Sequence, residues 1–75
     1  MVQEKIEYVI KTRDKKGNDV FLGEPNMIED YPMVTQLNFA NKFVDSTIAV
    51  IFLSAQKELL DKGFEVLAIK VIYEY

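Results

Sequence analysis

The sequence contains few side chains that could carry out acid–base or nucleophilic chemistry. It has no histidine and no cysteine, so it lacks the usual general acid–base group near neutral pH and the commonest metal ligand. Ser46 has no histidine to activate it, and its position at a predicted helix start favours a capping role. Glu29 and Asp30 are adjacent carboxylates, but two acids fall short of the roughly six to eight oxygens that calcium prefers. We therefore expect no enzymatic activity and no metal or other cofactor.

A short run of cations is the other feature that could bind a ligand. Lys11, Arg13, Lys15 and Lys16 gather at a predicted hairpin tip together with Asp14, and such a cluster could contact nucleic-acid phosphates. The whole chain carries a net charge of −3, whereas nucleic-acid-binding domains usually show a dominant basic footprint. A solvated turn that protects a sheet edge is the better interpretation. Weak nucleic-acid binding through this tip is the second alternative function.

Length and composition predict one folded domain over residues 1–75. The 75 residues are 49% hydrophobic and 28% charged, which is typical of globular rather than disordered chains. Domains of this size often need a disulfide, a metal or a partner chain, and this composition permits oligomerisation most easily. The longest apolar run, residues 48–53, is far shorter than the about 20 residues of a membrane span, and no signal peptide is expected. We expect a cytoplasmic protein that does not enter a membrane.

Hydrophobic periodicity predicts four strands and one helix. Residues 2–13 alternate between apolar and polar side chains, with Val2, Ile6 and Ile10 on the buried side, although Val9 breaks the pattern. Glycine and asparagine indicate a turn after this strand, because both tolerate a positive φ. The expected elements are strands over 2–13, 20–22, 35–40 and 64–75, a turn over 14–19, and a helix from an Asp45-Ser46-Thr47 cap to Leu60 or Lys62, closed by Gly63.

These elements predict an α+β fold. We expect a small, largely antiparallel sheet of three or four strands with one helix packed on one face, in the chain order ββ-β-α-β. The last strand has apolar residues at both parities, and a strand of this kind is typically covered on both faces. We therefore expect the last strand to lie inside the sheet.

The predicted helix carries more apolar surface than one core contact needs. Its apolar residues cover an arc of roughly 200°, whereas a one-sided surface helix needs about 100° or a little more. Two interpretations remain open: a curved sheet and the loop over residues 24–32 cover the whole arc, or part of it contacts another chain. The stripe that would make that contact consists of Ile48, Ile51, Ala55 and Leu59.

The loop over residues 24–32 is a second candidate for partner contact. Met27, Ile28 and Tyr31 stand out in this otherwise polar segment, which also holds both prolines of the chain. Tyrosine and methionine are enriched at protein interfaces. The alternative is that these side chains turn inward and close the core.

Short segments across most of the chain carry a resemblance. They are Tyr8-Val9-Ile10, Val20-Phe21-Leu22, Ala40-Asn41-Lys42-Phe43, Asp45-Ser46, Ala49 with Phe52-Leu53, and Gly63-Phe64-Glu65-Val66. In this order they resemble small uncharacterised proteins encoded by phages and prophages of Gram-positive bacteria. The resemblance implies a non-enzymatic accessory protein, since such proteins often act by binding a host enzyme or immune component.

The chain departs from that pattern on its helix. Helices of this kind commonly carry charges at the positions filled here by Ile48, Val50 and Ile51, and the departure points again to an interface. The leading hypothesis is therefore a protein that binds, and could inhibit, a host protein. The first alternative is a structural, self-associating protein that forms a homodimer.

Overall fold

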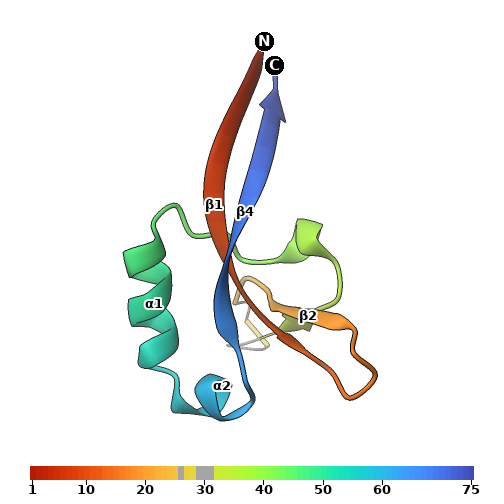
Figure 1. Cartoon of the computed structure of the whole chain (residues 1–75), viewed down its shortest axis with the longest axis vertical. Helices are drawn as coiled ribbons and strands as arrows, with labels where there is room; N and C mark the ends of the chain where they lie inside the picture. Colours follow the sequence, from red (N-terminus) through yellow and green to blue (C-terminus); the bar gives the residue numbers. More distant parts are fainter. Residues whose placement is uncertain (26, 29–31) are drawn as a thin grey trace.

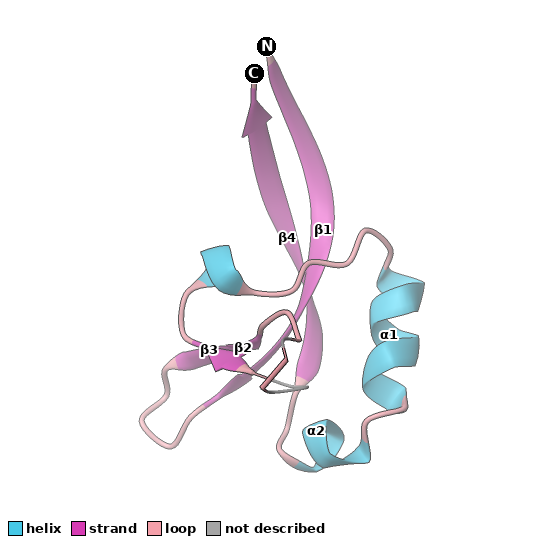
Figure 2. Cartoon of the chain, turned by 180° about the vertical axis from the view of Figure 1, so that it is seen from behind, coloured by secondary structure: helices cyan, strands magenta, loops and turns pink. Residues whose placement is uncertain are grey.

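The computed structural model describes residues 1–25, 27–28 and 32–75, and it confirms the α+β fold. Four antiparallel strands form a sheet in the order β3-β2-β1-β4, with helical segments beside it (Figures 1 and 2). The molecule measures 41 × 27 × 27 Å, because β1 and β4 extend together beyond the other elements (Figure 1). The elements in chain order are β1 (Val2–Arg13), β2 (Asp19–Leu22), β3 (Met33–Val34), the 3-10 helix η1 (Leu37–Phe39), α1 (Ser46–Ser54), α2 (Lys57–Asp61) and β4 (Glu65–Glu74).

The middle of the central strand β1 is buried on both faces of the sheet. Val9 and Ile10 are both fully buried, although consecutive residues of a strand point to opposite faces. Ile10 packs in a cluster with Leu53 and Leu59 from the two helices. Val9 packs in a second cluster that includes Ala40, from the segment after η1. The break in alternation at Val9 therefore marks a second covered face of the sheet.

The predicted strand over residues 35–40 is wrong. Strand β3 ends at Val34, and η1 follows it. The backbone N–H groups of Phe39 and Ala40 donate to the carbonyls of Gln36 and Leu37, so these amides form local bonds instead of a ladder. Leu37 and Phe39, whose spacing suggested the strand, are exposed. Ala40 alone turns inward and covers the sheet.

The prediction that the last strand lies inside the sheet is also wrong. Among the described residues, β4 pairs with β1 alone and forms an edge of the sheet. The other side of β1 is occupied by β2 and by Phe43, which exchanges two backbone hydrogen bonds of 2.8 Å with Tyr8. Apolar residues occur at both even and odd positions of β4 because the strand contacts a core cluster on each face of the sheet. Val66 packs against one cluster and Ile69 packs against the other.

The predicted single helix is divided into α1 and α2. Its predicted ends are confirmed: the Thr47 N–H donates to Asp45 Oδ1 over 2.7 Å, and Gly63 ends α2 with a φ of +82°. Two core residues explain the break. Leu53 and Leu59 lie about 120° apart around a continuous helix, yet both enter the same cluster. No helix in the described part of the chain is long and apolar enough to cross a membrane.

Beyond the core, β1 and β4 continue as a two-stranded arm, which we define as residues 1–6 and 70–75 (Figure 1). The arm holds the exposed ion pair between Lys70 and Glu4, 3.1 Å apart. Val2 and Ile6 were predicted to be buried, but they are 62% and 54% exposed. They share the parity of Ile10, so they lie on the face that α1 covers further along the sheet. That face is uncovered on the arm.

Candidate functional site

Of the residues first considered for catalysis, the structure describes Ser46 alone. Ser46 is the exposed first residue of α1, next to the capping Asp45. The Glu29-Asp30 pair lies outside the described residues. Within residues 1–25, 27–28 and 32–75, no group of three or more acidic side chains is placed to hold a metal ion.

The outward side of α1 is the most unusual surface. This nine-residue helix has the sequence STIAVIFLS, without a single charge, and it buries only Ala49 and Leu53. Ile48, Val50 and Ile51 are 52%, 50% and 64% exposed, and we call these three residues the α1 outer surface. A helix that is apolar all round is normally buried. The α1 outer surface is therefore an uncovered apolar patch of the kind that marks binding sites.

The predicted contact stripe is only partly present. Ile48, Ile51 and Ala55 are exposed, so the described sheet and loop residues do not cover the whole arc. Leu59 is 3% exposed and belongs to the core, which corrects its assignment to a contact surface. The break after α1 turns Leu59 inward and leaves Leu60 partly exposed.

The loop candidates fall on both described and undescribed residues. Met27 and Ile28 are exposed almost completely, so they do not close the core as the alternative interpretation required. Tyr31 lies outside the described residues. Met27 and Ile28 thus form a second exposed apolar surface among the described residues.

The basic hairpin tip is partly neutralised by its own chain. Asp19 accepts a hydrogen bond from Lys11 Nζ over 3.2 Å and lies 3.5 Å from Arg13 Nε. The hydrogen bond from Lys11, the charge of Lys11 and the nearby Arg13 hold the pKa of the Asp19 carboxyl below its usual value. Lys15 and Lys16 remain exposed in the turn. Only part of the tip is therefore available to a phosphate.

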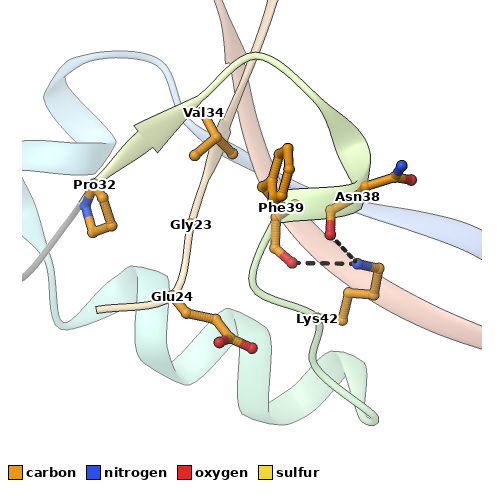
Figure 3. Close-up of a pocket in the computed structure, with 8 residues that line it drawn as sticks. Gly23, Glu24, Pro32, Val34, Asn38, Phe39 and Lys42 are labelled. Atoms are coloured by element: carbon orange, nitrogen blue, oxygen red, sulfur yellow. Dashed lines mark hydrogen bonds between the residues drawn. The ribbon is translucent and has the colours of Figure 1, made fainter. Parts of the chain in front are cut away.

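A pocket of about 370 Å³ lies between the β2 end and η1. Lys42 supplies its cation, but Nζ donates to the carbonyls of Leu37, Asn38 and Ala40, each at 3.4 Å. Figure 3 shows this amino group turned toward the backbone oxygens. The cation serves the end of η1 and is not directed at a ligand. The wall includes Gly23, Glu24, Pro32, Val34, Asn38 and Phe39.

The sequence did not reveal the arm as an exposed apolar surface. Val2, Ile6 and Ile72 lie on its helix-side face, and all three are more than half exposed. The register places Glu4 opposite Ile72 and Lys70 opposite Ile6. Residues opposite each other share a face, so this face combines the three apolar side chains with the Glu4–Lys70 ion pair and with Glu74, which lies opposite Val2. Apolar residues at both parities of the last strand were the available signal; they predict a strand inside the sheet and also add to the indication of an interface.

A buried carboxylate lies where the arm meets the core. Glu7 is 8% exposed, and the Tyr73 hydroxyl donates to its two oxygens over 2.8 and 3.0 Å. Lys5 Nζ lies 5.8 Å from the centroid of the Tyr73 ring. The hydrogen bond to Glu7, burial and the negative charge of Glu7 raise the pKa of Tyr73 above its ordinary value of 10.0. This contact fixes the arm to the core.

The Tyr73 contact predicts a loss of stability at alkaline pH. A raised pKa in the folded state contributes stability that is fully present below pH about 10 and is lost as pH rises through the folded-state pKa. We expect the unfolding midpoint in urea to fall more steeply above pH 10 for the wild type than for Tyr73→Phe. The Glu7→Gln variant keeps an acceptor but removes the charge, so its tyrosine should ionise at a lower pH. Equal alkaline slopes for wild type and Tyr73→Phe would contradict this assignment.

Comparison with known proteins adds no relative: no family model, curated protein or solved structure matches the chain. The described geometry and the sequence therefore carry the functional argument by themselves.

Proposed function

We propose that this chain is a non-enzymatic protein that acts by binding another protein through the α1 outer surface. The observation that carries the proposal is the absence of charge on α1 combined with the exposure of Ile48, Val50 and Ile51. In keeping with the resemblance described above, the partner would be a host protein and the chain a phage or prophage accessory protein in the host cytoplasm.

The chemistry of this surface defines the kind of partner. Ile48 and Ile51 lie about 60° apart around the helix and can enter an apolar groove together, whereas Val50 lies about 160° from Ile48 and borders the groove. Burying each of these side chains completely is worth about 1.5–3 kcal/mol. About half of each side chain is already covered, so the gain per residue is smaller. The helix offers no charge for an ionic partner. The partner surface should therefore be an apolar groove, the mode in which amphipathic helices are commonly bound.

Substitution of Ile51 should test this proposal directly. We expect immobilised wild-type chain to capture one host protein at near-equal stoichiometry from the lysate of a Gram-positive bacterium. Ile51→Lys should capture at least about tenfold less of it, because the complex would bury an unpaired charge. Quantitative mass spectrometry of the eluates provides the measurement.

Met27→Lys is the matched control. It also adds one cation at a fully exposed apolar position, but it lies on the loop and not on α1. It should capture as much of the host protein as the wild type does. Neither substitution should change stability by more than about 0.5 kcal/mol, because both sites are exposed. Loss of capture by Met27→Lys alone would move the binding site to the loop and contradict the proposal.

A further inference from the structure

The outer edge of β4 is long and poorly protected. Among the described residues, all ten positions of β4 pair with β1 on one side and with no strand on the other. Natural sheets usually guard such an edge with lysines, prolines, bulges or short strands. The sequence EVLAIKVIYE has no proline and a single lysine, Lys70. An edge of this kind is a template for pairing with another chain.

The backbone hydrogen bonds at the tip of the arm show which residues of β4 have N–H and C=O groups that point outward from the sheet edge. Met1 and Tyr75 exchange both of their backbone hydrogen bonds. Bonded and non-bonded pairs alternate in an antiparallel ladder, so Lys70, Ile72 and Glu74 direct their N–H and C=O groups away from β1. The pairing of Tyr8 with Phe43 supports the same alternation, because Tyr8 also directs its backbone away from the β1–β4 ladder.

We propose that β4 pairs with β4 of a second copy of this chain, antiparallel and centred on Ile72. The two copies would be related by a two-fold axis perpendicular to the joined sheet. Opposed residues must share a face of the sheet, so only residues of the same parity can be opposed. The axis therefore passes through one residue, which lies opposite its own copy. With Ile72 on the axis, Lys70 lies opposite Glu74 of the second copy, and Val71 lies opposite Tyr73. Lys70, Ile72 and Glu74 would each exchange both backbone bonds with the residue opposite.

Charge favours this register and this strand. A register centred on Lys70 would oppose two lysines, and like charges directly opposite are destabilising. Pairing through the free edge of β1 opposes identical charges when it is centred within the arm on Glu4 or Lys5, and it creates no opposite-charge pair when it is centred on Gln3. The Ile72 register instead creates two opposite-charge pairs. Within the described part of the chain, Glu74 has no cation within ion-pair distance, so it gains a partner.

The pairing also supplies what the isolated arm lacks. A two-stranded ribbon by itself is marginally stable, and three or more strands are needed for independent stability. The joined arms form a four-stranded sheet in the order β1-β4-β4-β1, with the cores at its two ends. This inference does not depend on the proposed function, because it uses the β4 edge and leaves the α1 outer surface free.

Sedimentation equilibrium of the purified chain tests the interface. We expect the wild type to approach twice the mass of one chain as its concentration rises. Ile72→Pro should weaken dimerisation at least about tenfold, because it removes an outward N–H that the β1–β4 ladder does not use. Lys70→Glu should also weaken it at least about tenfold by opposing two acids, and Lys70→Glu with Glu74→Lys should restore it. The proposal would be overturned if the wild type stayed monomeric, or if the double variant Lys70→Glu with Glu74→Lys failed to recover dimerisation.

A single introduced cysteine checks the register. The chain has no cysteine of its own, and opposed residues in a bonded antiparallel pair have Cα atoms about 5.5 Å apart, within the range that a disulfide spans. Ile72→Cys should therefore form a covalent dimer upon mild oxidation. Val2→Cys, which is equally exposed on the arm but away from the axis, should remain largely monomeric. Equal cross-linking of the two variants would contradict the Ile72-centred register.

Discussion

Replacing Ile10 with alanine should lower the free energy of unfolding by about 2–5 kcal/mol. Ile10 is fully buried at the centre of the cluster that joins β1 to both helices. The truncation leaves a cavity that the surrounding side chains can fill only in part. Because a domain of this length has only about 4–11 kcal/mol of stability in total, the variant should be partly unfolded at 37 °C. Urea denaturation followed by circular dichroism measures the loss.

Ile6→Ala is the matched control for this prediction. It makes the same substitution four residues earlier, on the same face of the same strand, where the side chain is 54% exposed. We expect a loss below about 1 kcal/mol, since little apolar contact is removed. Similar losses at the two positions would mean that the arm is as well packed as the core, and would contradict the description of the arm as uncovered.

The second large effect should appear at the helix break. Leu59→Ala should cost about 2–5 kcal/mol, because Leu59 is buried in the same cluster as Ile10. Leu60→Ala should cost less than about 1 kcal/mol, because Leu60 is 46% exposed. The same urea titration compares the two variants.

A continuous helix would give the opposite order. Leu60 lies seven residues after Leu53 and would share its face, whereas Leu59 would point about 120° away. A larger loss for Leu60→Ala than for Leu59→Ala would therefore show that α1 and α2 form one helix in solution.

The sequence predicted the elements better than their arrangement. Alternation identified β1 and placed Ile10 in the core, and the cap at Asp45 and the positive φ of Gly63 marked the two ends of the helical region. The break between α1 and α2 contains no glycine or proline to announce it. It follows from tertiary packing, because Leu53 and Leu59 both enter one core.

The candidate surface was predictable in part for a similar reason. Excess apolar residues on the helix correctly indicated that Ile48 and Ile51 exceed what one core needs. Alternation alone could not show that Val2 and Ile6 are exposed, because the same pattern serves a strand covered by a helix and a strand that extends past it. How far α1 reaches along the sheet decides between the two, and this reach is a property of the fold.

The most direct test of the central claim is the affinity of the purified chain for the host protein that it captures. Isothermal titration calorimetry should show that Ile51→Lys raises the Kd at least about tenfold over the wild type, a loss of roughly 1.4 kcal/mol or more, while Met27→Lys leaves it within about twofold. Circular dichroism would confirm that both variants are folded. An unchanged Kd for folded Ile51→Lys would show that the α1 outer surface does not bind the partner and would contradict the account.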